Sequence, residues 1–292
     1  MKKPEPEPAA RSPVFSSTVN FPHKRVGCII GEGLCRMSNK FYQPGEQRAA
    51  KVEDLFAAIA PRYDLINDLQ SLGLHRRWKR ALLKMADIKP GDRALDLCCG
   101  TGDIAFALQA AGADVVGIDF SPAMLAVAQE RAKNAGGAVG PARLQFLCAD
   151  ALKIPFADGS FDVVTVGYGL RNLAGWERGL EEMARVARPG GRVLVLDFGK
   201  PENKAWRIIY FAWLKFLVPL FGKVFCKDAA THAYIFESLR DYPAQRGVAA
   251  KMEALHCRDI QVRHLLGGAM SLHFGRTPSV PNPQVEMKFN PE

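Results

Sequence analysis

This 292-residue chain has no long apolar run, no regular cysteine pattern and no internal repeat. None of its apolar stretches reaches the roughly 18 residues that a membrane-spanning helix needs. The N-terminal sequence MKKPEPEPAARSP contains Glu5 and Glu7 and has no apolar core, which argues against a secretory signal peptide. We therefore expect a cytoplasmic protein.

Cysteine is too sparse and too irregularly spaced for a disulfide scaffold. There are seven cysteines, and the adjacent pair Cys98 and Cys99 lacks the spacing of a zinc site. We interpret this pair as small apolar residues in a buried strand, and we predict no metal. A reducing compartment agrees with this cysteine usage.

Acidic residues are fewer than basic ones. The chain has 30 Asp and Glu against 39 Lys and Arg, which gives a net charge of +9. A basic excess can serve nucleic acid, an anionic membrane or solubility alone. The basic residues are scattered along the chain, apart from HRRWKR at 75–80. We therefore predict no nucleic-acid partner.

The two ends of the chain differ in composition from the middle. We predict that residues 1–44 and 277–292 are disordered, and that Met37, which opens MSNKFYQPGEQ, is an alternative start of translation. Residues 45–276 form the predicted folded domain. Within it, the region 49–88 has apolar residues three and four apart, which indicates several short helices interrupted at Pro61.

Strand and helix patterns alternate after this region. The predicted strands are RALDLCC, DVVGIDF, RLQFLCAD, FDVVTVGYG and RVLVLDFG. Between them, GDIAFALQAAG and SPAMLAVAQERAKNAG read as helices, the second capped by Ser121 and Pro122, and GLEEMARVARPGG reads as a helix stopped by Pro189. Such apolar strands are covered on both faces, so we predict an α/β fold with a doubly wound, mostly parallel sheet.

The segment LDLCCGTGD at 95–103 places a glycine turn after the first strand. Gly100 and Gly102 allow a ligand to approach the backbone there, and GTGDIA matches the G-x-G-x-x-G/A fingerprint. Asp119 follows nineteen residues after Gly100, at the end of the second strand, where a carboxylate can bind two ribose hydroxyls. Both NAD enzymes and S-adenosylmethionine enzymes use this arrangement.

Two further acids favour S-adenosylmethionine over NAD. Asp96 lies inside the first strand, where it suits the cationic amino end of a methionine moiety and would repel a pyrophosphate. Asp150 follows the third strand, where its side chain can accept a hydrogen bond from an adenine amino group. Together with the glycine turn, these acids predict a class I S-adenosylmethionine-dependent methyltransferase.

Several segments sharpen the resemblance. The chain resembles the C-methyltransferases of menaquinone and ubiquinone biosynthesis over about 46–276, with YDxxND and G-[LI]-R-N as the specific motifs. The segments that carry it are APRYDLINDLQSLGLHRRWKR, LDLCCGTGD, ALKIPFADGSFDVVTVGYGLRN, RPGGRVLVLDFGKP and GGAMSLHFG. The resemblance implies a seven-stranded sheet, with the N-terminal helices 49–88 covering the substrate site.

The resemblance also implies a set of cofactor-binding residues. These are Thr101, Asp119, the pair Asp150 and Ala151, and Gly167. Position 150 is often Asn in the family, and position 167 is often Ser. An Asp can still accept from the adenine amine, whereas Gly167 offers only its backbone.

The implied reaction is methylation of a ring carbon on a prenylated hydroquinone, which is helped by loss of a phenolic proton. Arg171 and Asn172 follow the fourth strand and are the predicted catalytic pair. Arg171 stays protonated, so it would lower the phenol pKa or hold a water, while Asn172 would orient the ring oxygen. Tyr63 would close the site, and His273 has a structural or a catalytic role.

The segment 205–225, AWRIIYFAWLKFLVPLFGKVF, is rich in aromatic and aliphatic residues. It could pack over the sheet, cover the substrate channel or rest at a membrane surface. The predicted partners are therefore a prenylated quinol, a peripheral contact with the inner face of the cell membrane, and a second copy of the chain in a homodimer.

We predict conversion of a demethylmenaquinol to menaquinol, with a benzoquinol of ubiquinone biosynthesis as the alternative substrate. An NAD(P)-linked oxidoreductase is disfavoured because nothing supplies a nicotinamide-side site. An RNA methyltransferase is disfavoured because the chain lacks an Asn/Asp-Pro-Pro-aromatic motif and a Pro-Cys nucleophile. A non-catalytic scaffold of a quinone-synthesis complex would need neither Arg171 nor Asn172.

Overall fold

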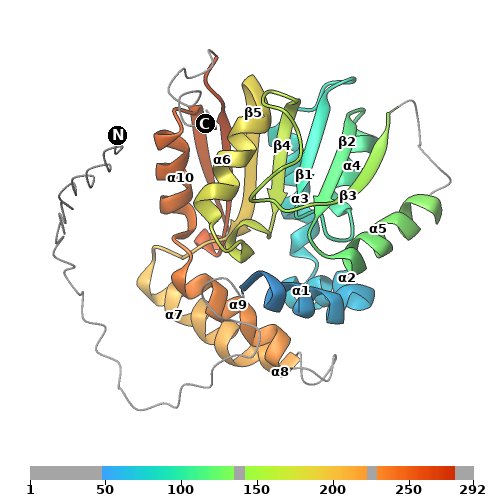
Figure 1. Ribbon diagram of the computed structural model, residues 1–292. Coiled ribbons are helices and arrows are strands. Elements are labelled where there is room, and N and C mark those ends of the chain that lie inside the picture. Colours follow the sequence, from blue (N-terminus) through green and yellow to red (C-terminus); the bar gives the residue numbers. More distant parts are fainter. Residues whose placement is uncertain (1–47, 135–141, 222–228, 280–292) are drawn as a thin grey trace, which may run out of the picture. The chain divides into compact units, whose positions relative to one another are not determined.

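The computed structural model describes residues 48–134, 142–221 and 229–279 (Figure 1). These residues belong to one compact unit, Ser38–Glu292. The segment 1–44, the start at Met37 and the part of the tail from residue 280 lie outside the described residues, so the predictions made for them stand as predictions.

A seven-stranded sheet forms the centre of the described structure, in the order β3-β2-β1-β4-β5-β7-β6. The strands are β1 (Arg93–Leu97), β2 (Asp114–Asp119), β3 (Leu144–Cys148), β4 (Phe161–Gly167), β5 (Ala187–Phe198), β6 (Arg258–Leu265) and β7 (Met270–Arg276). Strands β1 to β5 pair in parallel, whereas β7 is antiparallel to both β5 and β6. The prediction of a doubly wound, mostly parallel sheet is confirmed.

Helices surround this sheet. They are α1 (Arg48–Ile59), α2 (Tyr63–Ser71), α3 (Leu74–Ala86), α4 (Asp103–Ala110), α5 (Pro122–Asn134), α6 (Trp176–Val186), α7 (Lys204–Ala212), α8 (Val218–Phe221), α9 (Ala229–Asp241) and α10 (Ala244–Ala254). Shorter turns are η1 (Ala60–Arg62), η2 (Leu170–Asn172), the π-helix η3 (Trp213–Leu217) and η5 (Leu266–Gly268). Figure 1 shows α1, α2 and α7 to α9 grouped at one end of the sheet. No helix within the described ranges is both long and apolar enough to cross a bilayer.

Alternate residues of each central strand supply two separate cores. In β4, Val163 packs with Leu82 of α3 and Leu108 of α4, whereas Val164 packs on the opposite face with Met183 of α6. Successive strand side chains point to opposite faces, so a strand covered on both sides must be apolar at almost every position. This explains the near-continuous apolar runs in the sequence.

Several predicted boundaries are wrong, among them the end of the fourth strand, which lies at Gly167 and not at Gly169. Strand β1 ends at Leu97, before the cysteines, because Cys98 takes a left-handed backbone with φ 51° and the chain turns there. Helix α6 ends at Val186, and Ala187 already has the extended φ −73° and ψ 134° at the start of β5. Pro189 disfavours helical geometry at the residue before it, so a helix ends upstream of the proline and not at it. The cap at Ser121 is confirmed, since its hydroxyl accepts from the Met124 N–H at 3.4 Å.

Candidate active site

The carboxyl ends of β1 and β4 lie side by side where the strand order reverses, and ligands bind there in sheets of this kind. A pocket with an empty volume of about 900 Å³, open solvent included, lies at this edge. Its polar wall contains Asp119, Asp150 and Asn172. Its apolar wall is formed by Val52, Phe56, Phe120, Met124, Leu152 and Leu173. This volume is in the range of small-molecule sites in proteins.

Asp119 is held in place by two backbone donors at the end of β2. Its Oδ2 accepts from the Gly100 N–H at 2.8 Å, and its Oδ1 accepts from the Ser121 N–H at 2.9 Å. Each carboxylate oxygen retains a lone pair, so the side chain can still accept two ribose hydroxyls. Burial raises the pKa of Asp119, and the backbone N–H donors oppose that rise. The geometry fits the predicted ribose contact.

Asp96 has one satisfied oxygen and one unsatisfied oxygen. Oδ1 accepts from the Thr165 hydroxyl at 2.8 Å, but Oδ2 is buried with no hydrogen-bond partner. Burial raises the pKa of Asp96 to about 7. Asp96 lines a second, smaller pocket, which shares Gly100 and Gly167 with the larger one. A cationic donor would satisfy the unpaired oxygen, as the sequence predicts.

The other predicted cofactor residues fall into two groups. Asp150, Ala151 and Gly167 line the larger pocket, and Asp150 is exposed there with its Oδ1 accepting from the Leu152 N–H at 2.8 Å. Gly102 lines neither pocket. It caps α4 at φ 90°, and a Cβ there would lie 2.9 Å from the Phe106 ring, so its absent side chain serves packing.

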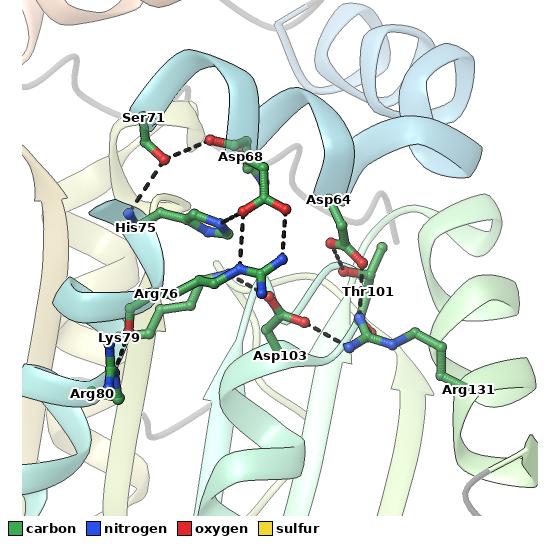
Figure 2. Close-up of polar contacts among 11 residues, drawn as sticks. Asp64, Asp68, Ser71, His75, Arg76, Lys79, Arg80, Thr101, Asp103 and Arg131 are labelled. Carbon is green, nitrogen blue, oxygen red and sulfur yellow. Dashed lines mark hydrogen bonds and ion pairs between the residues drawn. The ribbon is translucent and has the colours of Figure 1, made fainter. Parts of the chain in front are cut away.

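Thr101 lines the smaller pocket but its hydroxyl has a partner within the protein. The hydroxyl donates to Asp64 Oδ1 at 2.9 Å, and Arg131 Nη1 donates to the Thr101 carbonyl at 2.9 Å and to Asp64 Oδ2 at 3.1 Å. Figure 2 shows this network, which ties α2 to the glycine turn and to α5. Thr101 therefore couples the N-terminal helices to the cofactor edge.

The YDxxND motif braces α2 against α3. Asp68 of YDxxND accepts from His75 Nε2 at 2.8 Å and from Arg76 Nε and Nη2 at 2.9 and 2.6 Å, all across the turn between α2 and α3 (Figure 2). The hydrogen bonds from Arg76 and then His75 lower the pKa of Asp68. The motif thus fixes α2 against α3.

Arg171 and Asn172 lie together in η2, but they occupy different positions relative to the pocket. Asn172 lines the larger pocket, whereas Arg171 is buried behind it and lines neither pocket. Arg171 Nη1 donates to Asn172 Oδ1 at 2.5 Å and to the Ser238 hydroxyl at 2.8 Å, and its Nε lies 3.3 Å from Asp197 Oδ1. Arg171 therefore does not line the pocket itself, but it holds the Asn172 side chain that does.

The hydrogen bonds of Asn172 fix which of its atoms remain available. Its Oδ1 accepts from both Arg171 and the Tyr234 hydroxyl, the latter at 3.0 Å, so this atom is the carbonyl oxygen. Its amide nitrogen donates one hydrogen to the Tyr168 carbonyl at 3.1 Å. One N–H of Asn172 remains to donate to a ligand oxygen.

Tyr63 lines both pockets from the start of α2, as a residue that closes the site must. Burial raises the pKa of Tyr63 to about 12, so its hydroxyl stays protonated at neutral pH and acts as a donor. His273 is fully buried in β7, and its Nε2 lies 3.0 Å from the Gln245 carbonyl. His273 lines neither pocket, which agrees with the structural role.

Sequence reasoning missed several polar residues at the pockets, among them Asp103 of α4, which lines the smaller pocket. Glu53 of α1 lines the larger pocket, Lys79 of α3 lines the smaller one, and Tyr168 lines both. Tyr168 has the left-handed φ of 62° that a bulky residue rarely adopts, and its buried hydroxyl has no partner. Lys79 belongs to HRRWKR, the one basic cluster in the sequence, which was the available signal.

Comparison with known proteins places these features in a family. The profile of the ubiE/COQ5 methyltransferase family matches residues 44–277. A demethylmenaquinone methyltransferase of Beutenbergia cavernae is 41% identical over 232 residues, which cover 79% of this chain and 92% of that protein. The ubiquinone/menaquinone biosynthesis C-methyltransferase UbiE of Ectopseudomonas mendocina is 40% identical over 238 residues, which cover 80% and 92%.

Solved structures share the fold at low sequence identity. The [4+2]-cyclase SpnF superposes with a TM-score of 0.54 at 18% identity, covering 81% of this chain and 97% of that one. A Haemonchus contortus phosphoethanolamine N-methyltransferase 2, solved with S-adenosylhomocysteine, gives a TM-score of 0.52 at 17% identity and covers 68% and 52%. At such identities the likeness concerns the fold alone.

Proposed function

Because the chain belongs to the ubiE/COQ5 methyltransferase family, we propose that it methylates a ring carbon of a prenylated demethylmenaquinol. The protein is an S-adenosylmethionine-dependent methyltransferase, and S-adenosylmethionine supplies an electrophilic methyl group on a sulfonium centre. The observation that carries the proposal is one pocket that contains both Asp119 and Asn172. It can hold the methyl donor and the quinol ring together.

In this proposal Asp119 binds the donor's ribose, and Asp150 and Ala151 face its adenine. The apolar wall that includes Phe56 and Met124 lies against the two flat ring systems and keeps bulk water from them. Gly100 and Gly167 line both pockets, so at these two positions no side chain narrows the passage from one pocket to the other. The residues present fit the donor.

Asn172 is the proposed catalytic residue. Its remaining N–H donates to the quinol oxygen beside the reacting carbon, and that oxygen gains negative charge as its proton leaves. Arg171 polarises the Asn172 amide by donating to its Oδ1, and it holds that amide in one orientation. Arg171 is therefore proposed as a positioning residue that acts through Asn172, and Tyr63 as a further donor over the ring.

Glu53 is the proposed acceptor of the phenolic proton. Three carboxylates line the larger pocket, and in this proposal Asp119 and Asp150 are taken by the donor. Glu53 comes from α1, one of the helices that cover the site, and its side chain is half-buried. A base on that helix is present only when the cover is in place, which would couple deprotonation to closure.

Purified protein, labelled S-adenosylmethionine and short-chain quinols provide the test of this function. We expect methyl transfer to demethylmenaquinol, with Asn172→Ala lowering kcat about 10- to 100-fold at nearly unchanged donor affinity. Faster transfer to a demethylated benzoquinol would show that the substrate is the benzoquinol of ubiquinone biosynthesis instead. Donor binding without transfer to either ring would favour a non-catalytic scaffold.

We also propose that the face formed by α7, η3 and α8 rests on an anionic membrane surface. Tyr210, Leu214 and Val218 are buried at four-residue spacing, which leaves the opposite face outward. That outward face is apolar, with Ile208 71% and Phe216 60% exposed. Its remaining large exposed side chains are Ile209, Leu217 and Leu220.

Charge supports a membrane rather than a second copy of the chain as the occupant of this face. The segment 204–221 contains Lys204, Arg207 and Lys215 and no acidic residue. A basic apolar helix face suits anionic headgroups, whereas two copies facing each other would bring like charges together. A prenylated substrate would itself be drawn from such a bilayer. In the described part of this segment, residues 204–221, none lines either pocket, which favours the membrane surface over a channel cover.

Co-sedimentation with phosphatidylglycerol vesicles tests this surface. Ile208→Ser with Phe216→Ser should weaken binding about 10- to 100-fold, at roughly 1 kcal/mol or somewhat more for each side chain that enters the interface. Binding should also fall at high salt and on neutral vesicles. Unchanged vesicle binding, with a dimer converted to monomers by the same variant, would show a homodimer interface instead.

A further inference from the structure

Helix α9 supplies two buried polar side chains to the network behind the larger pocket. Tyr234 is 1% exposed and Ser238 is fully buried, and they lie one turn apart on the face of α9 that meets η2. Neither residue lines a pocket, and sequence reasoning identified neither. Burial of a polar side chain is costly unless it is hydrogen-bonded, so the partners of these two residues indicate what they do.

Tyr234 fills the second acceptor position of the Asn172 amide oxygen. The Tyr234 hydroxyl donates to Asn172 Oδ1 at 3.0 Å, and Arg171 Nη1 donates to the same atom. A carbonyl oxygen has two lone pairs, so both are then used. Two donors on this oxygen draw electron density from the amide and make its N–H groups stronger donors. Tyr234 therefore strengthens the one N–H that Asn172 can offer to a ligand.

Ser238 holds the guanidinium of Arg171. The Ser238 hydroxyl donates to the Ile235 carbonyl at 3.1 Å, and its oxygen accepts from Arg171 Nη1 at 2.8 Å. The two hydrogens of Nη1 are then taken by Ser238 and Asn172. A guanidinium only donates, so a reversed Asn172 amide would place its own N–H groups against those of Arg171. Ser238 thus keeps in place the group that sets the orientation of Asn172.

The ring of Tyr234 joins this network to the helix that covers the pocket. Tyr234 and Leu55 of α1 form a small core of their own, against which Val52 and Phe56 pack. Val52 and Phe56 also line the larger pocket. The guanidinium carbon of Arg171 lies 5.9 Å from the centre of the Tyr234 ring. Loss of the whole ring would disturb all these contacts, whereas Tyr234→Phe removes only the hydroxyl.

We propose that Tyr234 and Ser238 are positioning residues for methyl transfer that act through Asn172. Tyr234 polarises the amide oxygen of Asn172, and Ser238 holds the Arg171 guanidinium that orients this amide. The inference rests on the proposed function, in which the Asn172 N–H donates to the quinol oxygen as that oxygen gains negative charge. Because this charge develops in the transition state, loss of either contact lowers kcat and leaves substrate binding nearly unchanged.

Steady-state kinetics with a short-chain demethylmenaquinol measure this role. Tyr234→Phe and Ser238→Ala should each lower kcat about 3- to 10-fold, as the loss of one hydrogen bond predicts, and should change KM and the affinity for S-adenosylhomocysteine less than about twofold. In the Asn172→Ala background, Tyr234→Phe should change kcat less than about twofold, because the amide through which it acts is absent. Losses that multiply in this double variant, or unchanged kcat in both single variants, would overturn the proposal.

Tyr242→Phe is the matched control. Tyr242 is 3% exposed, and its hydroxyl has no hydrogen-bond partner among the described residues. Removal of this buried hydroxyl should leave kcat unchanged. A loss as large as that in Tyr234→Phe would show a general effect of burial and would overturn the proposal.

The side-chain amide signal of Asn172 in nitrogen-15-labelled protein tests the same contacts without turnover, and Asn172→Ala identifies this signal by its absence. The signal should be sharp in the wild type and broadened in Tyr234→Phe and Ser238→Ala, where the amide samples more than one orientation. Identical signals would overturn the proposal. Wild-type protein that methylates neither quinol would instead overturn the proposed function, and the amide signal would still report the positioning. If Tyr234→Phe does not fold, Ser238→Ala decides between the same outcomes.

Discussion

Replacement of Arg171 by Met should lower the free energy of unfolding. This loss must be measured before any effect of the variant on catalysis is interpreted. Arg171 is 5% exposed, and its guanidinium faces Asp197, which is fully buried. Asp197 also accepts from the backbone N–H of Arg171 at 3.0 Å and of Phe198 at 2.8 Å, so its carboxylate is fixed in place. Methionine retains most of the volume but leaves this buried carboxylate without a counter-charge.

The size of the effect follows from this burial. Breaking a buried pair by removing one partner costs about 3–5 kcal/mol, because the remaining charge stays desolvated. For a domain of this size, that loss lowers the unfolding midpoint by about 10 °C. Burial raises the pKa of Asp197 and Arg171 opposes that rise, so the pKa rises further in the variant. The deficit is therefore full above the raised pKa and shrinks as the pH falls through it, because protonated Asp197 is neutral.

A double-mutant cycle with Asp197→Asn measures the pair directly. Urea unfolding should show that the losses in Arg171→Met and Asp197→Asn are not additive in the double variant, because Asp197→Asn already removes the charge that Arg171 neutralises. Full stability in Arg171→Met alone, or additive losses in the double variant, would refute the assignment of a buried ion pair. Kinetics of any Arg171 variant are interpretable only at a temperature where this stability loss is tolerated.

Three further predictions concern the donor site and its cover. Asp119→Ala should weaken the binding of S-adenosylhomocysteine by roughly 1.5–3 kcal/mol, as measured by calorimetry. Unchanged affinity in a folded variant would contradict the assignment of Asp119 to the ribose. Burial raises the pKa of Asp96 to about 7, and its carboxylate is the expected contact of the donor's ammonium group. The affinity for S-adenosylhomocysteine should therefore rise about tenfold from pH 6 to 8, and a flat profile would contradict this contact. Asp64→Ala should lower the free energy of unfolding by only about 0.5–1 kcal/mol, because its ion pair is half exposed. It should still reduce turnover severalfold, because α2 and its Tyr63 are then no longer tied to Thr101. Unchanged steady-state rates would show that this contact does not affect catalysis.

Much of the fold could be predicted because it depends on local chemistry. The alternation of apolar strands and helices indicates the covered parallel sheet, and the cap at Ser121 satisfies backbone donors next to it in sequence. The position of Asp119 was predictable because the carboxyl ends of adjacent parallel strands lie at the same edge of the sheet. Asp119 and Gly100 follow two such strands, and they are in contact. The boundary between α6 and β5 could not be predicted from the sequence, because pairing with Phe161 of β4 extends β5 back to Ala187.

The polar networks depended on the tertiary structure. Arg171 and Asp197 are 26 residues apart, and Arg171 and Ser238 are 67 apart, so no local pattern indicated that the arginine would turn away from the pocket. Lys79 meets Asp103 across 24 residues and comes to the smaller pocket only when α3 packs beside the glycine turn. The sequence alone determined the sheet and which edge binds a ligand, because backbone pairing and burial follow from short-range apolar periodicity. Only the tertiary structure decided which charged side chains face that ligand, because each charge is placed by partners from distant parts of the chain.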